Sequence, residues 1–335
     1  MFMSKQLKRI SVGLAAVLAA GMIAGCGGGD KPANKDAKKT AKVGIVQLVE
    51  HNALDAANKG FVEGLKKRGY EEGKNITFDR QNAQADQSNL QNIAQRFINN
   101  KSDLIYAIAT PAAQTVANLT KDIPIVGSAI TDYEGAKLVK SNAKPGGNVT
   151  GTSDMNPIKE QIDLLIKLVP TAKTIGCVYC SSEVNSEVQV KAMKAYAESK
   201  GLKVETATIS TVNDIQQAAQ SLVGKVDAFY EPTDNIIASA MPTLASITDP
   251  AKKPVICGEP NMVKAGGLAT YGIDYFKLGA QSGDMAADIL DGKKKPADMA
   301  VQTAKELKVT INQKNADALG IKIPEDVLKG AEIAK

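Results

Sequence analysis

The sequence has few of the residues on which most enzymatic chemistry depends. It contains one histidine, His51, and four cysteines among 335 residues. A single histidine leaves little scope for a Ser-His arrangement, and His51 has no partner at metal-ligand spacing. No G-x-S-x-G turn, P-loop or G-x-G-x-x-G follows a predicted strand. We therefore expect no catalytic residue, no metal site and no cofactor.

Long blocks of like charge are also missing. The net charge is +5, and removing the charges of Lys5, Lys8 and Arg9 leaves about +2, spread evenly along the chain. A nucleic-acid-binding protein typically has clustered basic residues, which this sequence lacks, so we expect no nucleic-acid partner. Beyond the N-terminus no apolar run approaches the roughly 20 residues that span a bilayer. We therefore expect a body that does not cross the membrane.

The N-terminus has the features of a secretory signal. Lys5, Lys8 and Arg9 precede an apolar stretch over residues 10–23, and Ala24 and Gly25 lie just before Cys26. We predict a signal peptide over 1–25 and a flexible linker over 26–41, where nothing could form a core.

The run of residues 23–26, IAGC, resembles a bacterial lipobox, which implies that Cys26 is lipidated. The alternative is a plain cleaved signal with an incidental cysteine. We expect an extracytoplasmic protein that is lipid-anchored to a bacterial membrane.

From residue 43 onward, short apolar runs alternate with amphipathic segments. A first round comprises strands at 43–47, 75–79, 104–109 and 123–127 and helices at 54–69, 87–99 and 112–120. A second round comprises strands at 174–179, 202–206, 228–230, 254–257 and 268–271 and helices at 186–200, 215–223 and 236–247. This pattern predicts an α/β protein with two doubly wound parallel-sheet lobes joined by a hinge. We predict that residues 42–151 with about 273–303 form the N-terminal lobe, and 152–272 with about 304–335 the C-terminal lobe.

Ligands of open parallel sheets bind beyond the carboxyl ends of the strands. The residues that follow the predicted strands, or lie where the chain crosses between lobes, are therefore the candidates for ligand binding. They are Leu54, Asp55, Thr110, Pro111, Ala112, Ala113, Ser128, Thr131, Ser153, Asp154, Tyr179, Ser181, Ser182, Asn185, Asp234, Asn235, Glu259, Tyr271 and Asp274. Hydroxyls dominate the first lobe, whereas carboxylates are more frequent in the second.

One strand end predicts an anion site. The strand at 104–109 is followed by Thr110 and by Pro111, which suits the first position of a helix. We expect the N–H groups of Ala112 and Ala113 to be unpaired at the positive end of this helix, where a carboxylate would bind with help from the Thr110 hydroxyl. The alternative is that Thr110 only caps the helix.

Several motifs carry a resemblance to a known family. Two tandem lobes behind a lipobox resemble the type I periplasmic-binding-protein fold, the solute-binding component of an ABC importer. More narrowly, the sequence resembles lipoprotein binding subunits linked to tryptophan and phenylalanine uptake. The motifs are Ala53-Leu54-Asp55, ATPAAQ at 109–114, NVTGTSD at 148–154, Tyr179 with SSE at 181–183, Asn185-Ser186, Asp234-Asn235 and ATYGIDY at 269–275. The departures are Asn52, where this family would have proline, and the unfamiliar Cys177 and Cys180.

The resemblance implies a monomeric binding protein that clamps an α-amino acid between its lobes and delivers it to an ABC permease and its ATPase. The ligand would be aromatic, phenylalanine or tryptophan. Glu259 is the first candidate partner for its ammonium group, followed by Asp154 and Asp234, although each could instead be a helix cap or a surface carboxylate. Tyr179, Tyr230 and Tyr271 either stack on the ligand ring or pack ordinarily.

Alternative functions stay open at this level. The same fold could serve as a ligand-sensing receptor ectodomain for a branched-chain amino acid or another small solute, or as a hydrolytic two-lobe α/β enzyme. His51 either lines the cleft or only caps a helix. The C-x-x-C motif of Cys177 and Cys180 lies on a predicted strand, where residues three apart point to opposite faces about 10 Å apart, too far for a disulfide.

Overall fold

The computed structural model describes residues 40–334, which belong to one compact unit, Lys38–Lys335. The predicted signal peptide, Cys26 and nearly all of the predicted linker lie outside the described residues. No helix in the described part of the chain is both long and apolar enough to cross a membrane.

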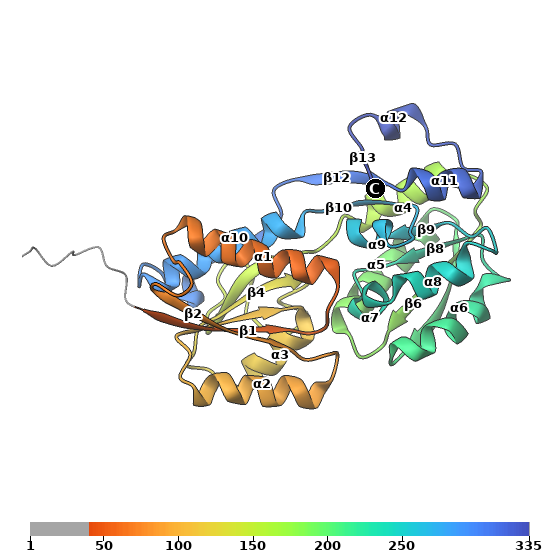
Figure 1. The fold of residues 1–335 in the computed structure, drawn as a ribbon. Coiled ribbons are helices and arrows are strands. Elements are labelled where there is room, and N and C mark those ends of the chain that lie inside the picture. The colour runs from red at the N-terminus through yellow and green to blue at the C-terminus, as the bar shows by residue number, and fades with distance from the viewer. Residues whose placement is uncertain (1–39, 335) are drawn as a thin grey trace, which may run out of the picture. The chain divides into compact units, whose positions relative to one another are not determined.

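The first lobe is built on a six-stranded sheet in the order β11-β5-β4-β3-β1-β2, with every pair parallel. Its strands are β1 Ala41–Gln47, β2 Ile76–Asn82, β3 Leu104–Ile108, β4 Ile125–Ile130, β5 Val149–Ser153 and β11 Gln302–Thr303. Its helices are α1 Asn52–Lys67, α2 Gln87–Asn99, α3 Thr110–Leu119 and α10 Tyr275–Leu290. Figure 1 shows α1 and α10 on one face of this sheet and α2 and α3 on the other. Helices on both faces explain why all of β3 and β4 is buried.

The second lobe contains a seven-stranded sheet in the order β13-β12-β10-β9-β8-β6-β7. Its strands are β6 Thr174–Cys180, β7 Lys203–Ile209, β8 Ala228–Glu231, β9 Val255–Cys257, β10 Ala269–Ile273, β12 Leu307–Ile311 and β13 Glu332–Ile333. Its helices are α4 Ile158–Leu168, α5 Val184–Ser199, α6 Ile215–Val223, α7 Asn235–Ser239, α8 Met241–Thr248, α9 Pro260–Lys264, α11 Gln313–Leu319 and α12 Glu325–Leu328. A short 3-10 helix at Val212–Asp214 precedes α6, and another at Pro296–Asp298 lies beside the first lobe's sheet. Two separate apolar clusters cover its two faces.

The two lobes confirm the predicted fold class. The chain passes between the sheets three times, after β5, after β10 and after β11. The residues at which the lobes divide remain a prediction, because the strands show only which sheet each segment joins.

Some boundaries differ from the prediction for local reasons. The predicted helix 236–247 is two helices, because Ala240 leaves helical geometry and Pro242 lies in the first turn of α8. The strand predicted at 123–127 begins later, at Ile125, just after Pro124, and continues to Ile130. One pair is antiparallel, β10 with β12, so the second sheet is mixed. The short helices α9, α11 and α12 were not predicted.

Helices α1 and α10 pack unusually closely through glycines. A methyl group on Gly60 would lie 2.0 Å from the carbonyl oxygen of Phe276, and one on Gly279 would lie 2.0 Å from that of Ala57. Gly64 and Gly283 meet backbone atoms of the opposite helix in the same way. Any side chain at these positions would push the helices apart.

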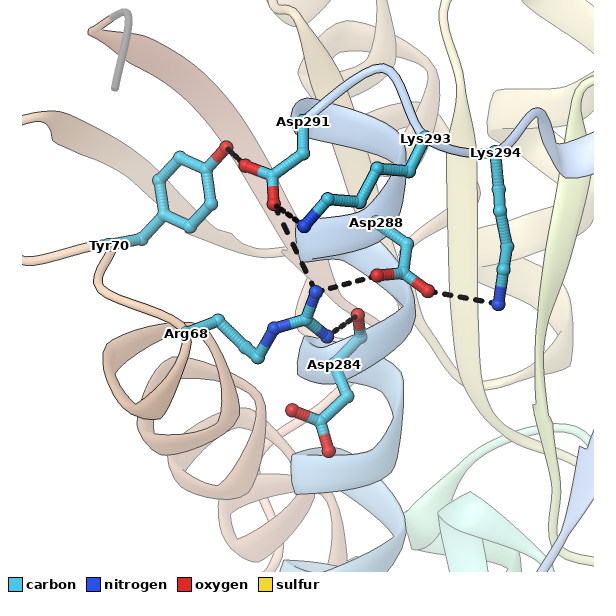
Figure 2. Close-up of polar contacts among 7 residues, drawn as sticks. All are labelled: Arg68, Tyr70, Asp284, Asp288, Asp291, Lys293 and Lys294. Atoms are coloured by element: carbon cyan, nitrogen blue, oxygen red, sulfur yellow. Dashed lines mark hydrogen bonds and ion pairs between the residues drawn. The ribbon is translucent and has the colours of Figure 1, made fainter. Parts of the chain in front are cut away.

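An ionic cluster holds the far ends of the same two helices together (Figure 2). Arg68, just after α1, donates to Asp288 of α10 over 2.6 Å, and Tyr70 donates to Asp291 over 2.7 Å. Lys293 and Lys294 pair with Asp291 and Asp288. The α1–α10 pair is therefore fixed along its length, and the N-terminal ends of both helices reach the cavity described next.

Candidate functional site

A small enclosed cavity lies where residues of both lobes meet. Its volume is about 10 Å³, room for about one water molecule. Its lining residues are His51, Ala53, Leu54, Ala129 and Tyr275 from the first lobe, Asp154 from the crossing after β5, and Thr233, Asp234, Asn235, Ala238 and Glu259 from the second lobe. Polar side chains of both lobes therefore meet at one narrow cavity, which would have to widen to admit a small solute.

His51 contacts the opposite lobe. Its Nε2 lies 3.2 Å from Oδ1 of Asn235, at the start of α7. His51 occupies the N-cap position of α1, but its side chain makes no capping hydrogen bond. Burial lowers the pKa of His51 to about 4, so the ring is neutral near pH 7. Its Nδ1 is buried and has no hydrogen-bond partner among the described residues.

Asn235 is held by a buried carboxyl group behind it. Glu183 accepts hydrogen bonds through Oε1 from the backbone N–H groups of Asn235 and Ile236, and through Oε2 from the side-chain amide of Asn235. Burial and the neighbouring Asp234 raise the pKa of Glu183 to about 8. These contacts fix both the backbone and the side chain of Asn235.

Asp154 is buried at the crossing between the lobes. Its Oδ2 accepts a 2.6 Å hydrogen bond from the hydroxyl of Tyr275, and its Oδ1 accepts one of 3.2 Å from Thr131. Burial raises the pKa of this carboxyl group, and the two hydroxyl donors oppose that shift. Among the described residues, no cationic side chain lines the cavity, so its carboxyl groups have no positive partner there within that part of the chain.

Glu259 lies at the N-terminus of α9. Its two carboxylate oxygens accept 2.7 Å hydrogen bonds from the backbone N–H groups of Asn261 and Met262. Burial raises its pKa to about 7, the N–H donors oppose this, and the charge of Asp154 adds to it. Glu259 caps α9 and also lines the cavity, so its role as a cap does not by itself exclude a role in ligand binding.

Asp234 has a mainly structural environment. It caps α7 through the N–H of Ile237, and its other oxygen accepts from the N–H of Cys180 and the hydroxyl of Ser186. Burial raises its pKa. Because both oxygens already accept strong bonds, Asp234 has less capacity for a ligand ammonium group than Asp154 has.

The predicted anion site needs one correction. Helix α3 begins at Thr110 rather than at Ala112, and the N–H of Ala113 donates to the carbonyl of Ala109. The Ala113 amide is therefore paired, and the prediction that it is unpaired was wrong. Ala109 has a φ of 86°, a strained value for a residue with a side chain. The Thr110 hydroxyl is buried without a partner among the described residues, but Thr110 does not line the cavity.

Five of the predicted residues line the cavity: Leu54, Asp154, Asp234, Asn235 and Glu259. Thr131 lies directly behind Asp154, to which it donates. Asn185 lies behind Asn235, where its side-chain amide donates to Glu183.

The other predicted residues are placed differently. Asp55 accepts from Gln47, Ser128 bonds to Thr152, and Ser153 donates to the carbonyl of Thr131. Pro111 and Ser182 line an open groove beside α3, Ser181 is exposed, and Asp274 caps α10. Ala112 is fully buried in the core of the first lobe.

The tyrosines proposed to stack on a ligand do not line the cavity. Tyr230 is buried in the second lobe, and its hydroxyl donates to Gln161. Tyr179 packs against the same core, and Tyr271 is half-buried on β10. Instead Tyr275, two residues past the end of β10, faces the cavity. It ends the motif quoted for the family resemblance but was not selected.

Sequence reasoning missed further lining residues. Ala129 and Thr233 follow strands as they were predicted, and the same rule could have found them, although the observed β4 extends past Ala129. His51 was left with two interpretations, and it lines the cavity. Ala238 lies inside a helix, and no sequence signal marked it.

The C-x-x-C motif is not a redox pair. Cys177 and Cys180 are free and buried on β6, and they belong to apolar clusters on opposite faces of the sheet. This placement on opposite faces is the one that the spacing of three residues on a strand predicted.

Two α/β lobes that enclose a small polar cavity define a solute-binding protein of the periplasmic-binding type. The chain belongs to the family of ABC transporter substrate binding proteins, whose family model matches residues 42–335. This confirms the predicted family resemblance and a binding protein rather than an enzyme.

Three relatives are similar over nearly their whole length. The tyrosine-binding protein of Clostridioides difficile is 45% identical, over 98% of this chain and 96% of its own. A Streptococcus pneumonia ABC domain in complex with L-Trp is 45% identical, covering 88% of this chain and 99% of that one, with a TM-score of 0.85. A ligand-free, open substrate-binding protein from Clostridium difficile is 47% identical over 88% and 99%, with a TM-score of 0.68. The chain is thus more similar in structure to the L-Trp complex than to the open form.

Proposed function

We propose that this protein binds a single aromatic amino acid in the cavity between its lobes and delivers it to an ABC permease. The observation that carries the proposal is the small cavity between the lobes, which is lined by carboxyl groups and, among residues 40–334, by no cationic side chain. Such a site favours a small ligand with a positive charge. The relatives support an aromatic side chain on the ligand, since the Clostridioides difficile relative is named a tyrosine-binding protein and the Streptococcus pneumonia domain is in complex with L-Trp.

The proposed orientation places the ligand ammonium group against Glu259 and Asp154. Both carboxyl groups are buried, and the pKa of each is raised, which a nearby ammonium ion would reverse. Asp234 is the third candidate; like Glu259, it accepts hydrogen bonds through both oxygens and caps a short helix of the second lobe.

The ligand carboxylate is proposed to bind at the start of α3. Thr110 offers a buried hydroxyl without a partner in the described structure, and the positive end of the helix dipole lies there. For Thr110 to reach the ligand, the closed cavity would have to extend toward Ala109 and Thr110 when it is filled.

Outside the described residues, we propose that Cys26 carries the lipid anchor and that the mature protein is a monomer on the outer side of a membrane. Replacing Cys26 by alanine would then abolish the incorporation of a labelled fatty acid into the protein. Equal labelling of the wild-type and Cys26→Ala proteins would contradict the anchor, and size-exclusion chromatography of the protein produced without residues 1–26 tests the monomer.

The ligand is tested by a thermal-shift screen of the twenty amino acids. A ligand at about 100 times its dissociation constant adds roughly 2.7 kcal/mol to stability. We expect tryptophan, tyrosine or phenylalanine to give the largest shift and dicarboxylates none, because a further buried carboxylate would be unpaired. Tight glutamate binding without aromatic binding would contradict the proposal. A branched-chain amino acid as the best ligand would favour the alternative side-chain pocket.

A further inference from the structure

His51 lines the cavity, but the proposed function gives it no role. Its ring nitrogen Nδ1 is buried, lacks a partner among the described residues, and belongs to a residue that lines the cavity. A buried polar atom without a partner is costly, so natural proteins rarely keep one without a reason.

The protonation of the His51 ring follows from its neighbours. Oε2 of Glu183 accepts hydrogen bonds from the side-chain amides of both Asn185 and Asn235. With its Nδ2 on Glu183, Asn235 presents its Oδ1 to His51. Because an amide oxygen can only accept, this orientation of Asn235 places the hydrogen of the His51 ring on Nε2.

The remaining nitrogen is then a hydrogen-bond acceptor. A neutral imidazole with its hydrogen on Nε2 has a free lone pair on Nδ1. Burial keeps the ring neutral by lowering its pKa to about 4. The first-turn N–H groups of α1 do not use this acceptor, since His51 makes no capping bond.

We propose that Nδ1 of His51 accepts a hydrogen bond from the side chain of the bound amino acid, and so selects aromatic rings that bear an N–H or O–H group over phenylalanine. The inference rests on the proposed function, because it needs an aromatic amino acid in the cavity. The ammonium group has other partners in Asp154 and Glu259, which leaves the side chain of the ligand as the donor for His51.

Different residues would thus bind different parts of the ligand. The carboxyl groups bind the ammonium group that every amino acid has, whereas His51 accepts a hydrogen bond from one atom of the ligand side chain. A site built to hydrogen-bond a ligand O–H or N–H rejects an analogue without it, because its own buried group stays unpaired. The contact with Asn235 of the opposite lobe fixes the orientation of the His51 ring. Discrimination between donor-bearing rings and phenylalanine therefore requires the closed arrangement of the lobes.

The first test changes the ligand and leaves the protein intact. Calorimetric titration compares L-tyrosine with L-phenylalanine, and L-tryptophan with 3-(3-benzothienyl)-L-alanine, in which a sulfur atom replaces the indole N–H without an added group. We expect at least one pair to differ by about 10- to 100-fold in affinity, in favour of the donor. The pair that differs identifies whether a phenol or an indole is read. Equal affinity within both pairs would overturn the inference while leaving an aromatic-binding protein.

The second test separates the two nitrogens of His51. In His51→Gln the amide nitrogen can replace Nε2 against Asn235, but the Nδ1 acceptor is gone. In His51→Asn the side-chain oxygen lies near the position of Nδ1, but the contact with Asn235 is lost. We expect His51→Gln to lose the preference for the donor-bearing ligand, and His51→Asn to keep it with weaker binding of every ligand.

Two results would contradict this assignment. An equal loss for phenylalanine and the donor-bearing ligand in His51→Gln would mean that His51 acts only through lobe contact or the ammonium group. If the wild-type protein binds no aromatic amino acid, the proposed function fails and the inference falls with it. Circular dichroism and the unfolding midpoint of each variant show that the fold is retained.

Discussion

The hydroxyl of Tyr275 donates a 2.6 Å hydrogen bond to Oδ2 of Asp154, and both residues are buried. Tyr275 opens α10 just after the chain leaves the second lobe, and Asp154 follows β5 just before the chain enters it. The bond therefore joins two of the three crossings between lobes at a wall of the cavity. It ties the hinge to the proposed ammonium site.

Removing this donor should weaken both stability and binding. Tyr275→Phe leaves Asp154 with the longer bond from Thr131 alone, and we expect a loss of about 1–3 kcal/mol in the free energy of unfolding. Urea denaturation measures the stability, and titration with the best amino acid measures the affinity. Unchanged values for both would show that the Tyr275 hydroxyl has no role at the hinge.

The raised pKa of Glu259 predicts that stability without ligand and affinity for the ligand change in opposite directions with pH. Its folded pKa of about 7 lies above its ordinary value, so its protonated form is favoured in the folded protein without ligand. This stabilisation is complete below about pH 4.5 and is lost as the pH rises toward 7. The ligand ammonium group needs the ionised form, so affinity should fall about tenfold per pH unit below 7. Unfolding and titration series between pH 5 and 8 measure both trends.

Glu259→Gln tests the same group directly. We expect a loss of roughly 100-fold or more in affinity, because the ammonium group is left in a buried site with one fewer charge. Since Glu259 also caps α9, a moderate loss of stability should accompany it, about 1 kcal/mol. Binding by Glu259→Gln equal to that of wild type would transfer the ammonium role to Asp154 or Asp234.

The close glycine contact between α1 and α10 predicts that replacing a glycine there by alanine lowers stability, opposite to the usual effect in a helix. Alanine normally stabilises a helix interior relative to glycine by about 1 kcal/mol. At Gly279 it should instead destabilise by roughly 1–3 kcal/mol, because the added methyl group would lie 2.0 Å from the carbonyl oxygen of Ala57. Gly147→Ala is the control, since no atom lies within 4 Å of its added methyl group. A stabilised Gly279→Ala protein would contradict the close contact.

The fold was largely predictable because alternating apolar runs and amphipathic segments are local signals. The helix at Ile215–Val223 was predicted at the bounds observed. Antiparallel pairing of β12 with β10 was not predictable, because pairing direction depends on the path of the chain rather than on the strand's own residues. Short helices such as α9 have too few residues for a periodic pattern.

The candidate site was only partly predictable. The strand-end rule found Asp154 and Glu259, but it could not tell which side chain at a strand end turns inward. Ser128 and Ser153 therefore joined the prediction although they bond to Thr152 and Thr131. The double role of Glu259 and the tautomer of His51 depend on neighbours distant in the sequence, which only the assembled lobes bring together.

The central claim, that one aromatic amino acid binds between the lobes, is tested most directly by calorimetric titration of the wild-type protein. L-tryptophan, L-tyrosine and L-phenylalanine are each titrated at pH 7.5, with L-glutamate and L-leucine as matched comparisons. The account predicts one site per chain and micromolar or tighter affinity for at least one aromatic ligand, with leucine weaker and glutamate not bound. Binding of glutamate or leucine without binding of any aromatic amino acid would contradict it.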